Sequence, residues 1–137
     1  MVLERISVPS YWRDRKIKYR LVGGECKSCN RRFFPYRRVC PYCGSTDVNE
    51  VNLPRRGKVV SFTVVHNAPR GFEYYTPYVM ALIELEDGTR LLSQLTDVEP
   101  DEVKEDMEVE MVLRIHRTCG ESWLIAYGYK FRPVLKK

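Results

Sequence analysis

The second half of the chain alternates apolar and polar residues with a period of two, as half-buried strands do. The clearest segment is 79–86, and the Asp87–Gly88 pair that follows it predicts a tight hairpin turn. The same alternation recurs in four further segments, 59–65, 89–95, 108–115 and 122–131. The pattern therefore predicts five strands.

Each of these segments has one predominantly apolar face. Its members, in chain order, are Val60, Phe62, Val64; Val79, Ala81, Ile83, Leu85; Leu91, Leu95; Val109, Met111, Leu113, Ile115; and Trp123, Ile125, Tyr127, Tyr129, Phe131. Residues 99–107, between the third and fourth segments, have room for one helical turn. Five strands with a short helical insertion after the third are typical of an OB-fold barrel, although another small barrel or a sandwich also fits.

The first part of the chain lacks this alternation. Residues 9–20 carry a helix-start signal with Ser10 as the expected N-cap, so a short helix is predicted there. Residues 52–58, with Pro54 and Gly57, indicate a joint. We therefore expect a mainly β protein, with a helix and zinc ribbon over residues 1–57 and the barrel over 58–137.

Four of the five cysteines lie close together, as two Cys-x2-Cys knuckles separated by ten residues. This spacing is a specific zinc signature, because each tight turn directs two thiolates toward one tetrahedral ion. Asn30 and Gly44 follow the two knuckles, where a left-handed residue is often needed. The predicted ligands are Cys26, Cys29, Cys40 and Cys43. Such a closed site is structural, with iron as the chemical competitor of zinc.

The charge is distributed unevenly. Residues 1–57 carry 13 Lys/Arg against 5 Asp/Glu, whereas residues 58–137 carry 10 against 13. Arg31 and Arg32, beside the cysteines, are candidates for binding phosphates, either of a nucleic acid or of a cofactor such as coenzyme A. A solvated basic face is the alternative.

The segment between the first two strands, residues 66–77, is long for an antiparallel connection. Its aromatic residues, together with the one just after it, are Phe72, Tyr74, Tyr75 and Tyr78. They are candidates for an apolar ligand slot or a partner anchor, the alternative being that the loop packs on itself.

The outer face of the second and third strands argues against single-stranded nucleic acid. It carries no aromatic platform, and Glu84 and Glu86 lie on it. Met80, Leu82 and Leu92 leave an apolar patch there, which implies a covering partner.

Catalytic patterns are few. His66 and His116 have no Ser/His/Asp or paired-carboxylate context, and Cys119 near His116 is interpreted as an incidental loop cysteine. We therefore expect a binding protein, not an enzyme. Hydrophobic residues make up 44% of the chain, without an apolar run long enough to cross a membrane or act as a signal core. A cytoplasmic protein is expected.

Three segments together resemble a known family: "KYRLVGGECKSCNRRFFPYRRVCPYCGS", "PYVMALIELEDG" and "AYGYKFRPV". The chain is similar over nearly its whole length to the small zinc-ribbon plus OB-fold proteins that accompany acyl-CoA enzymes. For an archaeal-type chain of this size, the resemblance implies a non-catalytic scaffold that joins acetoacetyl-CoA thiolase and HMG-CoA synthase in the mevalonate pathway. It also implies coenzyme A or acyl-CoA as a shared ligand. Accessory subunits of a hydratase or a thiolase-like aldolase, and a nucleic-acid-binding protein, are the alternatives.

Overall fold

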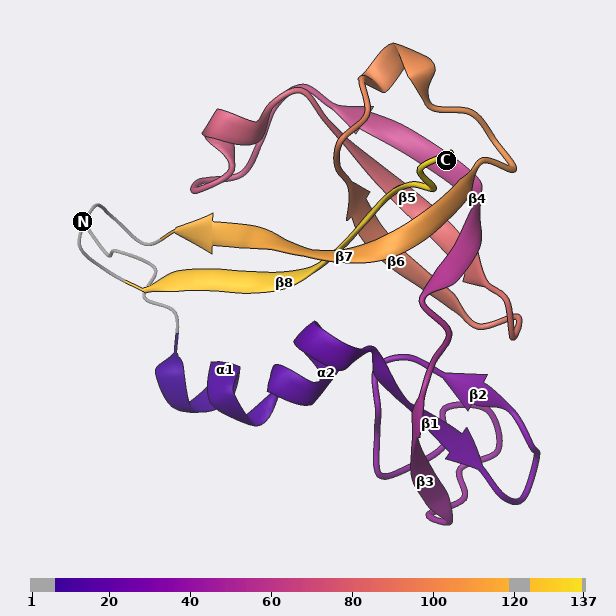
Figure 1. Ribbon diagram of the computed structural model, residues 1–137. Helices are drawn as coiled ribbons and strands as arrows, with labels where there is room; N and C mark the ends of the chain where they lie inside the picture. The colour runs from indigo at the N-terminus through magenta and orange to yellow at the C-terminus, as the bar shows by residue number, and fades with distance from the viewer. Residues whose placement is uncertain (1–6, 119–123, 137) are drawn as a thin grey trace.

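The computed structural model describes residues 7–118 and 124–136 and consists of two short helices, a zinc-ribbon sheet and a closed five-stranded barrel (Figure 1). The mainly β fold predicted from the residue pattern is confirmed. The elements are α1 (Val8–Arg13), α2 (Arg15–Arg20), β1 (Val22–Cys26), β2 (Arg32–Phe33), β3 (Val48–Asn52), β4 (Arg56–Val65), η1 (Glu73–Tyr75), β5 (Tyr78–Leu85), β6 (Arg90–Leu95), η2 (Pro100–Glu102), β7 (Glu108–Thr118) and β8 (Ile125–Pro133). None of the described helices is long and apolar enough to span a bilayer.

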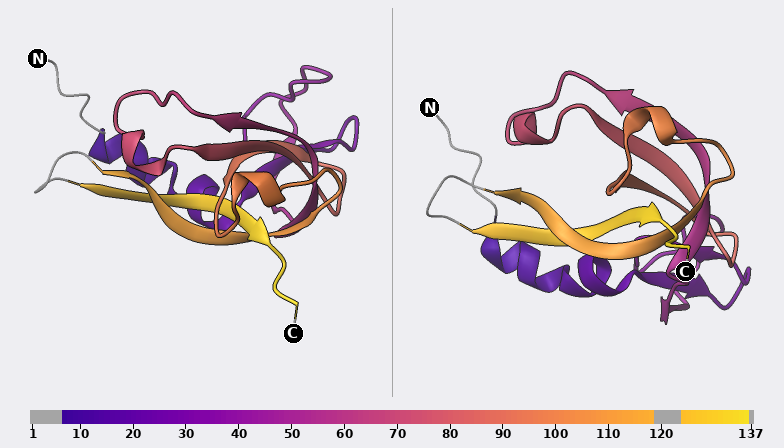
Figure 2. Two further views of the ribbon diagram at one scale, coloured as in Figure 1. Left: turned by 90° about the horizontal axis from the view of Figure 1, so that it is seen from above. Right: turned by 45° about the horizontal axis from the view of Figure 1, so that its top comes forward.

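The N-terminal helix differs from its prediction. Ser7, not Ser10, occupies the N-cap of α1, because Pro9 lies within the first helical positions, where its fixed φ favours helix initiation. Asp14 separates α1 from α2. The two helices run beneath the β7–β8 hairpin, and α2 contacts β8 (Figure 2).

The barrel follows the strand order β4-β5-β6-β8-β7, with β6 and β8 closing it in parallel through Leu95 and Phe131. In β5 every second residue is buried, which confirms the predicted face. The Asp87–Gly88 turn joins β5 to β6, with Gly88 at φ 85°. The helical insertion after the third strand is present as the 3-10 turn η2.

Three strands depart from simple alternation. In β7 the register shifts between Ile115 and Arg117, and Leu113 of the predicted apolar face is exposed. In β4 the register shifts between Val59 and Ser61, so Val59 is fully buried while Val60 is only partly covered. In β8 the predicted apolar face is buried at Phe131, but Ile125 and Tyr127 are exposed, and Ala126 on the opposite face is buried instead. That half of the β7–β8 hairpin extends beyond the barrel, so barrel closure does not decide which face is covered (Figure 1). Trp123 lies outside the described residues.

The ribbon and the barrel share a hydrophobic core. Leu21, after α2, and Leu53, after β3, belong to the same buried cluster as the barrel strands. Phe34 of the ribbon also packs edge-on against Tyr129 of β8, with ring centroids 5.4 Å apart. Strand β4 begins at Arg56, so the predicted boundary between residues 57 and 58 falls inside a strand.

Candidate metal centre and ligand pockets

The two cysteine knuckles have closely similar backbones. The N–H of Asn30 donates to the carbonyl oxygen of Cys26 at 2.9 Å, and the N–H of Gly44 donates to that of Cys40 at 3.0 Å. Asn30 and Gly44 have φ values of 54° and 74°, the left-handed conformation expected for residues that follow each knuckle. The two turns therefore present their sulfurs to a common centre.

The four sulfurs form a compact cluster in which all atoms lie within 4.8 Å of one another. Sγ of Cys26 lies 3.5 Å from that of Cys43, and Sγ of Cys29 lies 3.7 Å from that of Cys40. These separations are too long for disulfides. A tetrahedral ion with Zn–S bonds of about 2.3 Å places its sulfurs about 3.8 Å apart, so the quartet fits one zinc ion.

The close packing of the four thiols shifts the pKa values of two of them in opposite directions. The pKa of Cys26 is lowered to about 6, chiefly by a hydrogen bond from the backbone N–H of Cys29. At Cys43 the strongest influence, the backbone N–H of Ser45, lowers the pKa, but the neighbouring sulfurs and burial outweigh it and raise the pKa to about 12. Full ionisation therefore needs a cation, and Zn²⁺ would supply the compensating charge.

Arg31 and Arg32 line a groove of about 430 Å³ between the ribbon and the β5–β6 turn. The guanidinium of Arg32 forms ion pairs with Glu25 at 3.3 Å and Asp87 at 3.4 Å. Arg31 instead lies over the ring of Tyr42, 5.0 Å from its centroid. Arg32 thus helps to fix the ribbon against the barrel, while Arg31 lines the groove and forms no ion pair with any described residue.

The four aromatic candidates do not line one path. Tyr75 and Tyr78 line a pocket of about 350 Å³, here called the mouth pocket, at the barrel end where β5 begins and β6 ends. Phe72 lines another hollow of about 230 Å³ with His116 and Tyr11, although its ring centroid lies 6.4 Å from that of Tyr78. Tyr74 is 96% exposed. The loop therefore divides its rings among two pockets and the solvent.

The arginines and the aromatic loop lie at opposite ends of β5. Asp87, the partner of Arg32, lies two positions beyond Leu85, the last residue of the strand, whereas Tyr78 is its first. The eight residues of β5 are separated by seven steps of about 3.3 Å, which gives roughly 23 Å between its first and last residues. The structure therefore does not bring the predicted phosphate and pantetheine contacts into one pocket of this chain.

Two basic residues of the mouth pocket, Lys130 and Arg114, were missed by the sequence reasoning. Lys130 stands between Tyr129 and Phe131 in an apolar strand, and a lysine flanked by two aromatics is the signal that could have identified it. Arg114 occupies a polar position of an alternating strand, which by itself is unremarkable.

His116 is one of the two histidines of the chain. Its ring packs edge-on against Phe72, with centroids 5.9 Å apart, and burial, followed by the charges of Lys130, Lys18 and Arg117, lowers its pKa. No hydrogen bond to this ring is found in the described part of the chain. Cys119 lies outside the described residues.

Comparison with known families also divides the chain into a zinc ribbon followed by an OB-fold barrel. Residues 18–49 match the family described as "ChsH2, rubredoxin-like zinc ribbon domain", and residues 50–114 match "ChsH2, C-terminal OB-fold domain". Over 131 residues the chain is 53% identical to a "DUF35 domain-containing scaffold protein" of Pyrococcus furiosus, covering 96% of each chain. This chain belongs to the DUF35 family of ChsH2-type zinc-ribbon and OB-fold proteins.

Other relatives are subunits of acyl-CoA enzymes by name. The chain is 34% identical to "Benzoylsuccinyl-CoA thiolase subunit BbsA" of Geobacter metallireducens, over 83% of this chain and 75% of the relative. Among solved structures, the "Ltp2-ChsH2(DUF35) aldolase" superposes with a TM-score of 0.69 at 32% identity, covering 93% of this chain and 96% of that one. This DUF35 chain is therefore a scaffold-type protein associated with acyl-CoA enzymes.

Proposed function

We propose that this chain is a non-catalytic scaffold subunit that joins acetoacetyl-CoA thiolase and HMG-CoA synthase in the mevalonate pathway of an archaeal cytoplasm. The observation that carries the proposal is its 53% identity, over 96% of both chains, to the scaffold protein of Pyrococcus furiosus. Identity over nearly full length favours a shared scaffold role.

The surface of the chain suits a protein that works by docking. Leu92 is 63% exposed on β6, and Trp12, Leu113 and Ile125 are also exposed. Large apolar side chains on several elements offer anchors for partner enzymes. The four-cysteine site uses all its ligand positions for protein atoms and so favours a structural role.

A contribution to acyl-CoA binding is the second part of the proposal. Arg31 and Arg32 remain the candidates for coenzyme A phosphates, supported by the groove that they line. Phe72, Tyr74, Tyr75 and Tyr78 remain the candidates for pantetheine or partner contacts. Because the two sets lie at opposite ends of β5, we expect them to serve different parts of a ligand, or different ligands, in the assembled complex.

The second candidate function is an accessory subunit of an acyl-CoA hydratase or a thiolase-like aldolase. It is favoured by the structural similarity to the aldolase complex at a TM-score of 0.69. The two functions predict different partners, and this distinguishes them.

The test is co-purification of the tagged, zinc-loaded chain with each candidate enzyme from the same genome. Stable complexes with thiolase and synthase together, and none with a hydratase or aldolase, would support the proposal. The reverse pattern would replace it by the second function. Turnover of acetyl-CoA by the purified chain alone would contradict the non-catalytic role.

Coenzyme A affinity of the assembled complex tests the ligand residues. The double substitution Phe72→Ala with Tyr75→Ala should weaken binding without releasing zinc, and Arg31→Ala should do so independently. Tyr74→Ala tests whether the loop anchors a partner enzyme, because the ring of Tyr74 is exposed in the isolated chain. Loss of assembly in the Tyr74 variant would assign the loop to a partner interface. Unchanged coenzyme A affinity in the first two variants would exclude these residues as ligand contacts.

A further inference from the structure

Lys130, in β8, is a buried lysine with only 4% of its surface exposed. Lysines are almost never buried to this degree unless an anion pairs with them. Within the described part of the chain, its ammonium group has no ion pair and no hydrogen-bond acceptor. Its one specific contact is with the ring of Tyr75, whose centroid lies 4.8 Å from Nζ.

Lys130 lines the mouth pocket together with Arg114, Tyr75, Tyr78 and Asp97. The pocket lining therefore contains two cationic side chains and one carboxylate. The two tyrosines come from the connection before β5 and from its first residue, and Arg114 comes from β7. Three separate segments thus converge around a lysine that forms no ion pair within the described ranges.

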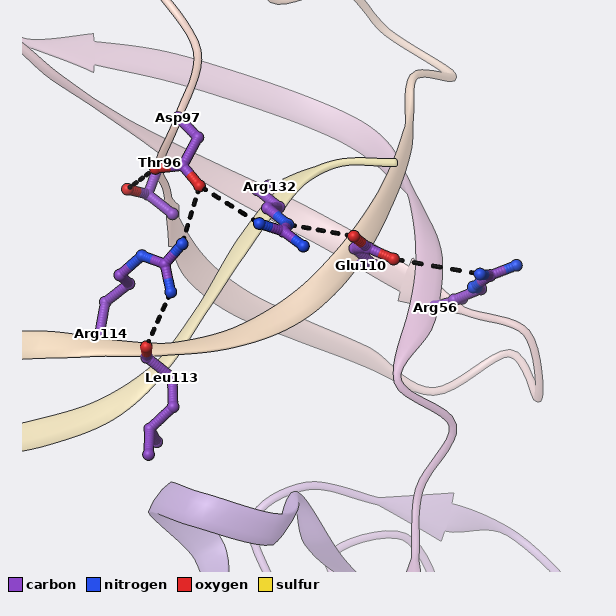
Figure 3. A network of polar contacts seen from close by, with 7 residues as sticks. All are labelled: Arg56, Thr96, Asp97, Glu110, Leu113, Arg114 and Arg132. Atoms are coloured by element: carbon purple, nitrogen blue, oxygen red, sulfur yellow. Dashed lines mark hydrogen bonds and ion pairs between the residues drawn. The ribbon is translucent and has the colours of Figure 1, made fainter. Parts of the chain in front are cut away.

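The one carboxylate of the pocket is already engaged. Asp97 accepts a hydrogen bond from Nη2 of Arg114 at 2.9 Å and forms an ion pair with Nη1 of Arg132 at 3.8 Å (Figure 3). Arg132 is in turn bound to Glu110 at 3.0 Å. With Arg56, which lies 4.0 Å from Glu110, the network contains three arginines and two carboxylates, so both carboxylates are already paired and neither pairs with Lys130.

The burial of Lys130 and the nearby positive charge affect its pKa. Its pKa is lowered, first by burial and then by repulsion from Arg114. Both causes disfavour the ammonium form, and a bound anion would reverse them by supplying opposite charge within the pocket.

We propose that the mouth pocket binds an anionic oxygen group, a carboxylate or a phosphate, with Lys130 as its positive anchor and Tyr75 and Tyr78 packing on the adjoining part of the ligand. This site is distinct from the groove at Arg31 and Arg32, which lies at the other end of β5. It does not depend on which enzymes the chain joins. The alternative is a packing lysine whose stem merely fills the space under Tyr75.

The test is a titration of the full-length, zinc-loaded chain with inorganic phosphate and, separately, with acetate, followed by amide NMR at constant ionic strength. We expect saturable shifts at Tyr75, Tyr78 and Lys130 with at least one of the two anions. Saturation by phosphate alone would assign the site to a phosphorylated ligand such as a nucleotide, and saturation by acetate alone to a carboxylate-bearing acyl group.

Matched variants identify the anchor. Lys130→Met keeps the length of the side chain and should weaken anion binding by about tenfold or more, the effect of losing one charge-assisted hydrogen bond. Lys104→Met removes the same charge from an exposed position and should leave binding unchanged. Asp97→Asn should strengthen binding several-fold because it removes the competing carboxylate, and asparagine tolerates the φ of 58° at this position.

Several results would overturn the proposal. These are the absence of saturable shifts with both anions, equal affinity in the wild type and the Lys130→Met variant, or weaker binding after Asp97→Asn. The Asp97 variant keeps the proposal testable if Lys130→Met does not fold. Co-purification of Lys130→Met with the partner enzymes separates the two proposals, because loss of the anion site should leave assembly intact.

Discussion

Among the residues that the structure describes, the main buried cluster holds twelve side chains of the barrel and its junction, whereas the ribbon's own cluster holds only three, Cys26, Phe33 and Cys40. Two of those three are metal-ligand candidates. The barrel can therefore fold by burying apolar surface, while the ribbon needs its zinc ion to compensate the conformational entropy of its turns. Two modules of one chain thus obtain stability from different sources.

The difference between ribbon and barrel is smaller where the two modules meet. Leu21 and Leu53 precede β4 in the chain but are buried with the barrel core. The ribbon end nearest the barrel is consequently stabilised by hydrophobic contacts, and the knuckle end by metal. We expect a gradient of stability along the ribbon, which the following substitutions test.

The largest effect is expected for Cys40→Ser, which removes a buried sulfur of the quartet. Zinc binding contributes on the order of 10–16 kcal/mol to such modules, so the knuckles should unfold while the barrel persists. Metal analysis and amide exchange measure the two parts separately. Cys119→Ser is the control with the same chemical change, and it should retain one zinc per chain. Loss of the barrel together with the knuckles would refute independent sources of stability.

Truncation of a side chain in the barrel core should destabilise the barrel and leave the zinc knuckles intact. Ile83→Ala removes a side chain that is 0% exposed and should lower the free energy of unfolding of the barrel by about 2–5 kcal/mol. Leu92→Ala, on the neighbouring strand but exposed, should cost less than about 0.5 kcal/mol in the isolated chain. Denaturant titration measures both, and zinc content should be unchanged in each. Zinc loss from the Ile83 variant would show that the modules fold as one unit.

Phe34→Leu sharpens the comparison at the junction. It removes the edge-on contact with Tyr129 but keeps an apolar side chain of similar size, so we expect a loss of about 0.5–1.5 kcal/mol. The double-mutant cycle with Tyr129→Leu isolates the ring–ring term. A coupling energy near zero would mean that the shared aliphatic residues, not the aromatic pair, join the ribbon to the barrel.

The smallest effect is expected for Lys16→Gln. Nζ of Lys16 lies 3.2 Å from Glu50, but the two side chains are 52% and 49% exposed. Exposed pairs are screened by water and salt, so the change in stability should be within about 0.5 kcal/mol and vanish at high salt. A loss well above this that disappears at high salt would indicate that the pair holds α2 on the ribbon, and a salt-independent loss would assign the effect to packing of the Lys16 stem.

The features predicted correctly from the sequence are those set by neighbouring residues. The Cys-x2-Cys turns, with Asn30 and Gly44 in the left-handed conformation, depend on a few adjacent positions, and so does the Asp87–Gly88 hairpin. The buried face of β5 follows from strand periodicity because the barrel covers that face along the whole strand. In β8 periodicity failed where the hairpin leaves the barrel, since a strand's pattern does not say where its cover ends.

The tertiary structure alone decided how the candidate ligand residues are grouped. The amino-acid sequence determined the zinc quartet and the barrel, because ligand spacing and period-two burial are local properties of the chain. The sequence could not reveal that Arg32 and Tyr78 are held at opposite ends of β5. Nor could it reveal that the ring of Tyr75 lies against the ammonium group of Lys130. Those relations join residues 46 and 55 positions apart in the chain, and their distances follow from how the barrel closes.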